Sequence, residues 1–250
     1  MSGHNKWSTI KRKKGALDAK RSKIFSRIVK EIMVAVKEGG PDPNGNPRLR
    51  VAIGNAKGVN MPKDNILRAI NKAQGEGANF EEITFEGYGP GGVAIFVECL
   101  TDNHKRTVSD VRSYFTKRNG TLGTNGSLNF IFDRKGIFEI VVSKINLEEL
   151  ELDLIDAGAQ DIDVESDSEM ITITTSMEDF KKMSDKLESL KVEVENAQLK
   201  RIPNSTKEVD IGTARSILKL VDLFEEHDDV QDVYHNLEIT DDLAKALEEE

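Results

Sequence analysis

The hydrophobic period of the chain changes at Gly75–Gly77, and this change predicts a helical part followed by a mixed part. Before these glycines, apolar residues recur every three to four positions between about Leu17 and Val36, as expected of an α-helix. From residue 83 onward, short apolar runs typical of strands alternate with helical segments. With 250 residues, the chain is long enough for more than one domain of ~100–200 residues.

The same glycines separate two regions of opposite charge. Residues 1–77 hold 17 Lys and Arg against 6 Asp and Glu, a net charge of +11. Residues 78–250 hold 18 against 38, a net charge of −20, so the total of −9 conceals the difference. Such an asymmetry indicates a polyanion-binding head on an acidic body.

The first long helix is predicted to have two unlike faces. On a helical wheel, the apolar side chains from Ile24 to Val36 fall mostly on one side, and the other side holds Lys20, Lys23, Arg27, Lys30 and Lys37. We therefore expect one face to pack and the other to present cations. After Gly39-Gly40-Pro41 we expect a shorter helix near 49–57, and then a helix that begins at Pro62.

The acidic body is predicted to contain two ferredoxin-like α/β domains. Residues 135–202 give the order βαββαβ, which is the ferredoxin-like arrangement. On either side, a strand at 92–100, a helix capped by Thr107, and a strand at Ser127–Phe132 form one half-unit, and residues 198–234 form another. Residues 192–202 are also compatible with a single long strand that serves both domains.

These patterns predict an α+β fold in which a helical N-terminal domain precedes two α/β domains, one inserted into the other. The predicted boundaries are 1–78 for the basic helical domain, 79–134 plus 203–250 for the split domain, and 135–202 for the inserted domain.

The sequence favours binding over catalysis. The four histidines and Cys99 have no metal-ligand spacing, and no nucleophile, Walker A or dinucleotide motif is present. The glycine-rich segment Gly87–Gly92 precedes a strand and is therefore better explained as a turn than as a phosphate cradle. We predict a protein without enzymatic activity, metal or cofactor.

The rest of the composition predicts a cytoplasmic monomer. One cysteine excludes an internal disulfide, and no apolar run approaches the ~18 residues of a membrane span. The N-terminus has positive charge but no apolar core of a signal peptide, and no dimer seam is evident in the pattern.

The candidate binding residues lie mainly in the first 30 positions, where cations surround the single tryptophan. Cations contact phosphates, and an indole can stack on a base, which suits single strands and RNA loops. Trp7 can equally anchor the N-terminal arm to the helical domain. The predicted nucleic-acid-binding residues are Lys6, Trp7, Lys11, Arg12, Lys13, Lys14, Lys20, Arg21, Lys23, Arg27, Arg48 and Arg50.

Several segments together resemble the YebC family, whose members include a mitochondrial translational activator of cytochrome c oxidase. They are GHNKW (3–7), DAKRSKIF (18–25), NPRLR (46–50), NMPKDNI (60–66), EGYGPGG (86–92), DNHKRTVSDVR (102–112), GTNGS (123–127) and VQDVYHN (230–236). They span nearly the whole chain in the order of the family. Asn5 and Ser22 stand where many members have Ser and Gly, and neither change affects the cationic pattern.

The resemblance implies a helical domain, two α/β domains, and function by binding. Family members are described both as DNA-binding transcriptional regulators and as translation factors that act on ribosomes, including at proline runs. A basic arm with Trp7 suits irregular RNA, and the helix from Lys63 to Ala73 has Asp64 where DNA phosphates would lie. We therefore expect a translation factor that docks on ribosomal RNA, with a DNA-binding transcriptional regulator as the alternative. The segments Gly87–Gly92 and Asn103–Arg106 are further candidate functional tips.

Overall fold

The computed structural model describes residues 17–75, 79–141, 147–164 and 170–248. The chain forms two compact units. The first unit comprises the described parts of Met1–Arg27, Ala78–Asp133 and Ile202–Glu250. The second unit comprises those of Ile28–Gly77 and Arg134–Arg201. The domain boundaries that we predicted from the sequence stay a prediction.

Three helices form the N-terminal region: α2 (Leu17–Gly39), α3 (Pro47–Gly58) and α4 (Lys63–Gln74). Residues 32–36 of α2 are buried on all sides, together with apolar residues of α3 and α4 such as Leu49 and Ile66. The predicted two-faced pattern is therefore wrong for this half of α2, because Met33 and Val34 are buried although the wheel places them near the polar side. Pro62, the predicted first residue of this helix, is the N-cap of α4, and the helix begins one position later, at Lys63.

In the second unit, α3 is joined to the strand β7 (Val194–Pro203) by a reciprocal pair of hydrogen bonds. The side-chain amide of Asn55 donates to the Ala197 carbonyl (2.9 Å) and accepts from the Ala197 amide (2.8 Å). At Gly58 a Cβ would collide with the Glu195 backbone, so only glycine permits this approach.

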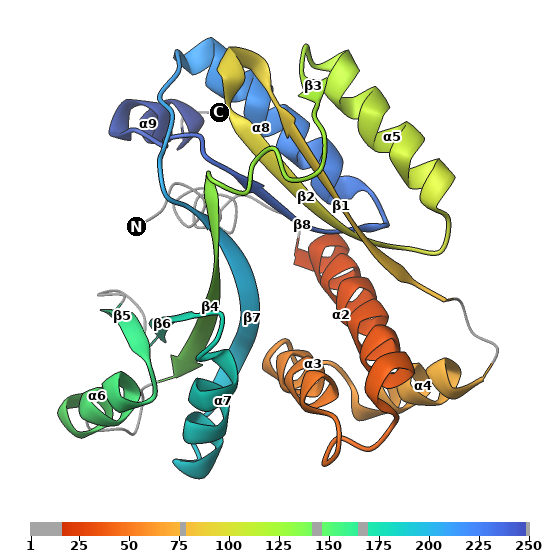
Figure 1. The fold of residues 1–250 in the computed structure, drawn as a ribbon, viewed down its shortest axis with the longest axis vertical. Helices are drawn as coiled ribbons and strands as arrows, with labels where there is room; N and C mark the ends of the chain where they lie inside the picture. Colours follow the sequence, from red (N-terminus) through yellow and green to blue (C-terminus); the bar gives the residue numbers. More distant parts are fainter. Residues whose placement is uncertain (1–16, 76–78, 142–146, 165–169, 249–250) are drawn as a thin grey trace. The chain divides into compact units, whose positions relative to one another are not determined.

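The sheet of the first unit has the strand order β3-β1-β2-β8 and is antiparallel at every pair. Its strands are β1 (Glu81–Tyr88), β2 (Ala94–Thr101), β3 (Thr121–Leu122) and β8 (Val230–His235). The short 3-10 turn η1 (Pro90–Gly92) joins β1 to β2. The helices α5 (His104–Lys117), α8 (Ile211–Glu226) and α9 (Asp241–Glu248) share the main hydrophobic core with this sheet (Figure 1).

Three details of the predicted split domain are wrong. The strand β1 was not predicted, because Glu81, Glu82 and Glu86 interrupt its apolar pattern. Residues 127–131 form turns instead of a strand, and their apolar side chains, Leu128 and Ile131, pack in a small core with Phe96 and Tyr234. The helix α5 begins at His104, so Thr107 is an internal helical residue and not the cap.

The inserted segment forms the second sheet, with the order β5-β6-β4-β7. Its elements follow each other as β4 (Phe132–Val141), α6 (Leu147–Asp156), β5 (Ala159–Val164), β6 (Met170–Ser176), α7 (Phe180–Ser189) and β7. This connectivity and strand order are ferredoxin-like, as predicted. The residues 194–203 form one long strand, which was the alternative that the sequence left open.

The observed architecture confirms the predicted α+β class, with a helical N-terminal region and two antiparallel sheets. Since the strands of the second sheet lie in sequence between β3 and β8, one sheet interrupts the other along the chain. Within the described residues, no helix has the length and apolar character that a membrane crossing requires.

Candidate nucleic-acid interface

The predicted binding residues fall into two groups. Lys6, Trp7 and the cations at 11–14 lie outside the described residues, and the side chain of Lys20 in α2 is also not described. The remaining five are Arg21, Lys23, Arg27, Arg48 and Arg50, and their surroundings can be compared. In the structure, four of these five are partly buried.

The cations in the first half of α2 lie beside groups of their own unit. Arg21 is exposed, with its guanidinium 5.4 Å from the centre of the Phe25 ring. Arg27 donates to the carbonyl of Glu225 at 3.0 Å. Burial and the positive charge of Arg27 lower the pKa of Lys23, whereas Asp228, Glu226 and Glu225 oppose this shift.

This arrangement contradicts the predicted cationic face of α2. Lys23 and Arg27 are partly buried, whereas Ile24, which we expected to pack, is 42% exposed. The physical reason is the acidic segment at 225–228, which attracts the cationic side of the helix. That segment is 200 residues away in sequence, so a helical wheel cannot include it.

Arg48 and Arg50 are held by the second unit. Arg48 forms ion pairs with Glu38 (2.8 Å) and Glu31 (3.4 Å) on α2. Arg50 donates to the carbonyls of Pro43 and Asn44, both at 3.1 Å. These guanidinium groups stabilise the connection between α2 and α3, and this role competes with phosphate binding.

The second unit presents other cations that the sequence analysis did not select. The side chains of Lys57, Lys63, Arg68 and Lys72 are exposed and make no hydrogen bond or ion pair to a described residue. The last three lie on the outer face of α4 with one acid, Asp64. The signal was available in sequence, because the buried residues Ile66, Ala69 and Ala73 leave these cations on the opposite side of the helix.

The first NPRLR residue, Asn46, has a structural role. Its side chain is buried and caps α3 by accepting from the amide of Leu49 at 3.0 Å. The same side chain donates to the carbonyls of Ala35 (2.7 Å) and Gly40 (2.9 Å), which end α2. The asparagine therefore joins two helices by satisfying their terminal backbone groups.

Glu86 in EGYGPGG organises the GTNGS loop of the first unit. Its buried carboxylate accepts from the amides of Gly126 (2.7 Å) and Leu128 (2.6 Å) and from the hydroxyl of Ser127 (3.3 Å). At Gly87 a Cβ would lie 2.6 Å from the Thr121 carbonyl oxygen, so a glycine is required there. Glu86, the residue directly before the predicted functional tip at Gly87–Gly92, thus fixes this loop, and Gly87 permits the close approach of β1 to β3.

Asp229 organises the DNHKRTVSDVR segment. This buried carboxylate accepts from the Arg106 guanidinium (2.7 Å) and from the hydroxyls of Thr107 (2.9 Å) and Thr101 (3.1 Å). Arg106 also pairs with Asp102 at 2.9 Å, and the hydrogen bonds that Arg106 donates to these two acids, first of all to Asp229, raise the Arg106 pKa. The positive charge of Arg106 is therefore neutralised within the fold.

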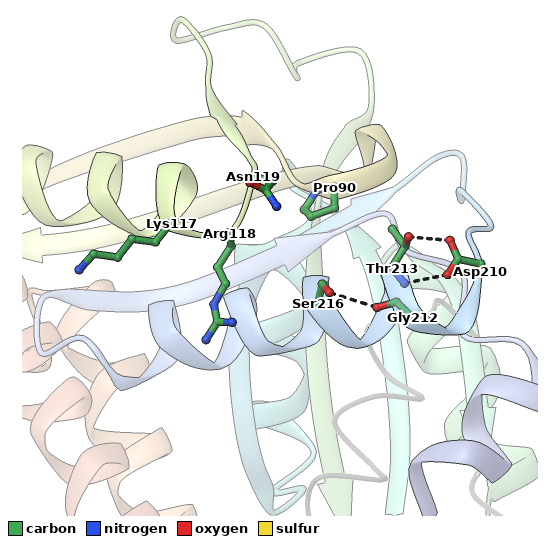
Figure 2. A pocket seen from close by; sticks show the side chains of 8 residues that line it. All are labelled: Pro90, Lys117, Arg118, Asn119, Asp210, Gly212, Thr213 and Ser216. Carbon is green, nitrogen blue, oxygen red and sulfur yellow. Dashed lines mark hydrogen bonds between the residues drawn. The ribbon is translucent and has the colours of Figure 1, made fainter.

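One polar hollow of about 430 Å³ lies where the end of α5 meets the start of α8. Figure 2 shows its lining: Lys117 and Arg118 extend away from Asp210, which caps α8 through the amide (3.0 Å) and hydroxyl (2.6 Å) of Thr213. These hydrogen bonds lower the pKa of Asp210, so the carboxylate is charged at neutral pH. Because a carboxylate lies at one end, this hollow is an unfavourable binding site for a polyanion.

Among the residues that the structure describes, no three His, Cys, Asp or Glu side chains gather in a way that could hold a metal ion. His227 in the acidic C-terminal segment accepts at Nδ1 from the Asp229 amide (3.1 Å) and has Nε2 3.1 Å from Asp110. The ring therefore bridges α5 and the segment after α8.

Comparison with protein families agrees with the motif order and the fold. The family model described as "TACO1/YebC protein N-terminal domain" matches residues 5–76, and that described as "TACO1/YebC second and third domain" matches residues 80–237. The chain belongs to the TACO1/YebC family. The resemblance inferred from the motifs is confirmed.

Relatives of this TACO1/YebC chain match it over its full length. A "Probable transcriptional regulatory protein" of Chlorobaculum parvum is 48% identical over 100% of both chains. One of Geobacter sulfurreducens is 50% identical over 99% of this chain and 100% of its own. A crystal structure of "a Conserved Hypothetical Protein Aq1575 from Aquifex Aeolicus" has 45% identity and a TM-score of 0.78, with 89% of this chain and 92% of that chain covered.

Proposed function

We propose that this TACO1/YebC protein is a nucleic-acid-binding regulator of gene expression, and more specifically a translation factor that docks on ribosomal RNA. One observation carries the proposal: the first 77 residues have a net charge of +11, and the remainder has −20. The exposed cations on α3 and α4 support it, because their side chains bond to none of the described residues and can contact phosphates. At the ribosome, the protein assists synthesis of difficult nascent sequences such as proline runs.

We favour RNA over duplex DNA as the ligand because the exposed face of α4 is mixed in composition. A helix that reads the major groove presents a regular face to base edges, and dimers commonly read two half-sites. The exposed face of α4 includes Asp64 and Leu67, the latter 45% exposed, among its cations. Ribosomal RNA offers loops and irregular surfaces that such a mixed face can fit.

A DNA-binding transcriptional regulator is the second candidate function. The observation that favours it is the name of the relatives from Chlorobaculum parvum and Geobacter sulfurreducens, "Probable transcriptional regulatory protein". Both candidates use the same cations, since phosphate contacts carry no sequence information. In either case we propose binding without catalysis or cofactor, by a monomer in the cytoplasm.

Sedimentation with purified bacterial ribosomes tests the proposal. At 50 mM salt we expect the protein to pellet with ribosomes, and a promoter-length DNA duplex in excess should not displace it. If about six cations contact single-stranded phosphates, log affinity should fall with log salt at a slope near −4, and duplex phosphates would give about −5. Protein that stays in the supernatant at low salt would contradict ribosome docking. A sequence-specific DNA footprint would support the second candidate instead.

A further inference from the structure

The outer face of α5 carries exposed cations in the otherwise acidic first unit. Lys105, Ser109, Arg112 and Thr116 follow each other at intervals of four, three and four residues, so they lie on one side of the helix, and all four are exposed. The opposite side holds Thr107, Val111 and Phe115, which are buried in the core. We call these four residues the α5 outer face.

Three acids around α5 are paired with other groups of the first unit. Asp102 and Asp229 accept from Arg106, and Asp110 lies 3.1 Å from His227 Nε2. In contrast, the side chains of Lys105 and Arg112 make no hydrogen bond or ion pair with any described residue, and the hydrogen bond that Arg112 accepts from Thr116 uses its backbone carbonyl. The helix thus holds its own negative charges in internal contacts and leaves two positive charges for an external partner.

The α5 outer face leads into a hollow of about 270 Å³ at the end of the helix. Arg112 and Thr116 line it together with Gly120, Thr121, Leu122 and Gly123. None of these residues is acidic, unlike the lining of the hollow in Figure 2, which includes Asp210. Its wall is also tightly packed, because a Cβ at Gly120 would lie 2.9 Å from the Tyr88 carbonyl oxygen.

We propose that the α5 outer face and this hollow form a second RNA-binding surface, which contacts backbone phosphates through Lys105 and Arg112. The inference rests on the proposed function, and it adds a binding surface in a different unit from α4. Charge complementarity identifies the partner, because two exposed cations on one helix face, of which Arg112 also lines an acid-free hollow, attract an anion. The two cations are seven residues apart, which is ~10.5 Å along a helix, so they reach separate phosphates of one strand. The hydroxyl of Ser109, which lies between them on the same side of the helix, supplies a further polar contact.

The test compares two double variants of the full chain that remove the same charge. Lys105→Gln/Arg112→Gln alters the proposed surface, and Lys207→Gln/Lys219→Gln removes two exposed lysines elsewhere in the first unit. Affinity for fluorescently labelled ribosomal RNA fragments is measured by anisotropy across 50–300 mM salt, and thermal unfolding verifies that each variant is folded. The charge-keeping variant Lys105→Arg/Arg112→Lys serves as the rescue.

We expect the α5 variant to bind on the order of tenfold more weakly, with the salt slope reduced by about 1.4, while the control and the rescue bind as the wild type. If wild type binds and both double variants match it, the second surface is wrong and the proposed function stands. Equal weakening of both variants would also overturn it, because the effect would then reflect net charge. If wild type itself does not bind RNA, the proposed function fails and this inference fails with it.

Discussion

The helices α2 and α4 both carry several cations, but the surroundings of these cations differ. On α2, Arg27 donates to the Glu225 carbonyl, and Lys23 is partly buried beside the acids at 225–228. On α4, Lys63, Arg68 and Lys72 are exposed and make no hydrogen bond or ion pair to a described residue. The number of cations in a helix therefore does not measure its capacity to bind a polyanion. That capacity depends on how many cations are left after the fold has satisfied its own carboxylates and carbonyls.

The same contrast exists within the single helix α5. The Arg106 guanidinium is bound by Asp229 and Asp102, whereas the side chain of Arg112, less than two turns later, makes no hydrogen bond or ion pair to a described residue. Removal of an internally bound cation or its partner should therefore change stability, and removal of an external cation should change RNA affinity.

The largest expected effect is on stability, at the acid that binds Arg106. Asp229→Ala leaves the buried hydroxyls of Thr101 and Thr107 and the Arg106 guanidinium without their acceptor. We expect the free energy of unfolding to fall by about 3 kcal/mol. Urea denaturation measures this change, with Asp102→Ala as the matched control, since that acid is exposed and its loss should cost less than about 1 kcal/mol. Equal losses in both variants would contradict the central role of Asp229.

The next effect is on RNA affinity, at α4. Lys63→Gln/Arg68→Gln/Lys72→Gln should weaken binding to ribosomal RNA by tenfold or more, which is about 1.4 kcal/mol per factor of ten, and reduce the salt slope by about 2. Anisotropy titrations measure both quantities. The variant Lys63→Arg/Arg68→Lys/Lys72→Arg keeps the charge and should bind normally. Unchanged affinity in the triple glutamine variant would remove α4 from the interface.

A smaller effect is expected at Arg50. Arg50→Gln removes two hydrogen bonds to the Pro43 and Asn44 carbonyls, so stability should fall by about 1 kcal/mol while RNA affinity changes little. Arg68→Gln is the matched control with the opposite expectation, because its stability should stay within about 0.5 kcal/mol. A large loss of RNA affinity in folded Arg50→Gln would show that internal hydrogen bonds do not prevent phosphate binding.

The smallest effect is a pH dependence at Asp210. Hydrogen bonds from Thr213 lower the Asp210 pKa in the folded chain, so the charged form stabilises the fold. This contribution is complete above the unfolded pKa of about 3.9 and is lost as the pH falls through the lower folded value. Asp210→Asn keeps a helix cap but cannot titrate, so its stability should differ from wild type at neutral pH and converge with it in acid. Parallel pH profiles for the two proteins would contradict this assignment.

Much of the fold was predictable because its signals are local. The period change at Gly75–Gly77 separated the helices from the sheets, and the βαββαβ order identified the inserted sheet. The first strand of the β1–β2 hairpin was not predicted because Glu86 interrupts its apolar pattern. In the structure this glutamate is buried, and its carboxylate accepts hydrogen bonds from backbone amides in and directly after the GTNGS loop. When the hydrogen-bond donors of a buried acid lie far away in sequence, the residues around the acid do not reveal that it is buried.

The candidate site was harder to predict for the same reason. The charge difference between the two parts of the chain was visible in the sequence, and the family resemblance followed from the motifs. Which cations are bound within the fold depends on groups far along the chain, such as the Glu225 carbonyl for Arg27 of α2 and the Asp229 carboxylate for Arg106. Several motif residues, including Asn46 and Glu86, prove to hold helices and loops together. Similarity of motifs therefore identifies the family without separating its structural residues from its binding residues.

Crosslinking of the protein in bacterial cells, followed by sequencing of both bound RNA and bound DNA, tests the central claim most directly. We predict a discrete patch of ribosomal RNA, with crosslinks reduced in the α4 triple glutamine variant and retained in Arg50→Gln. Recovery of promoter DNA with ribosomal RNA at background would contradict the translation-factor proposal and favour transcriptional regulation.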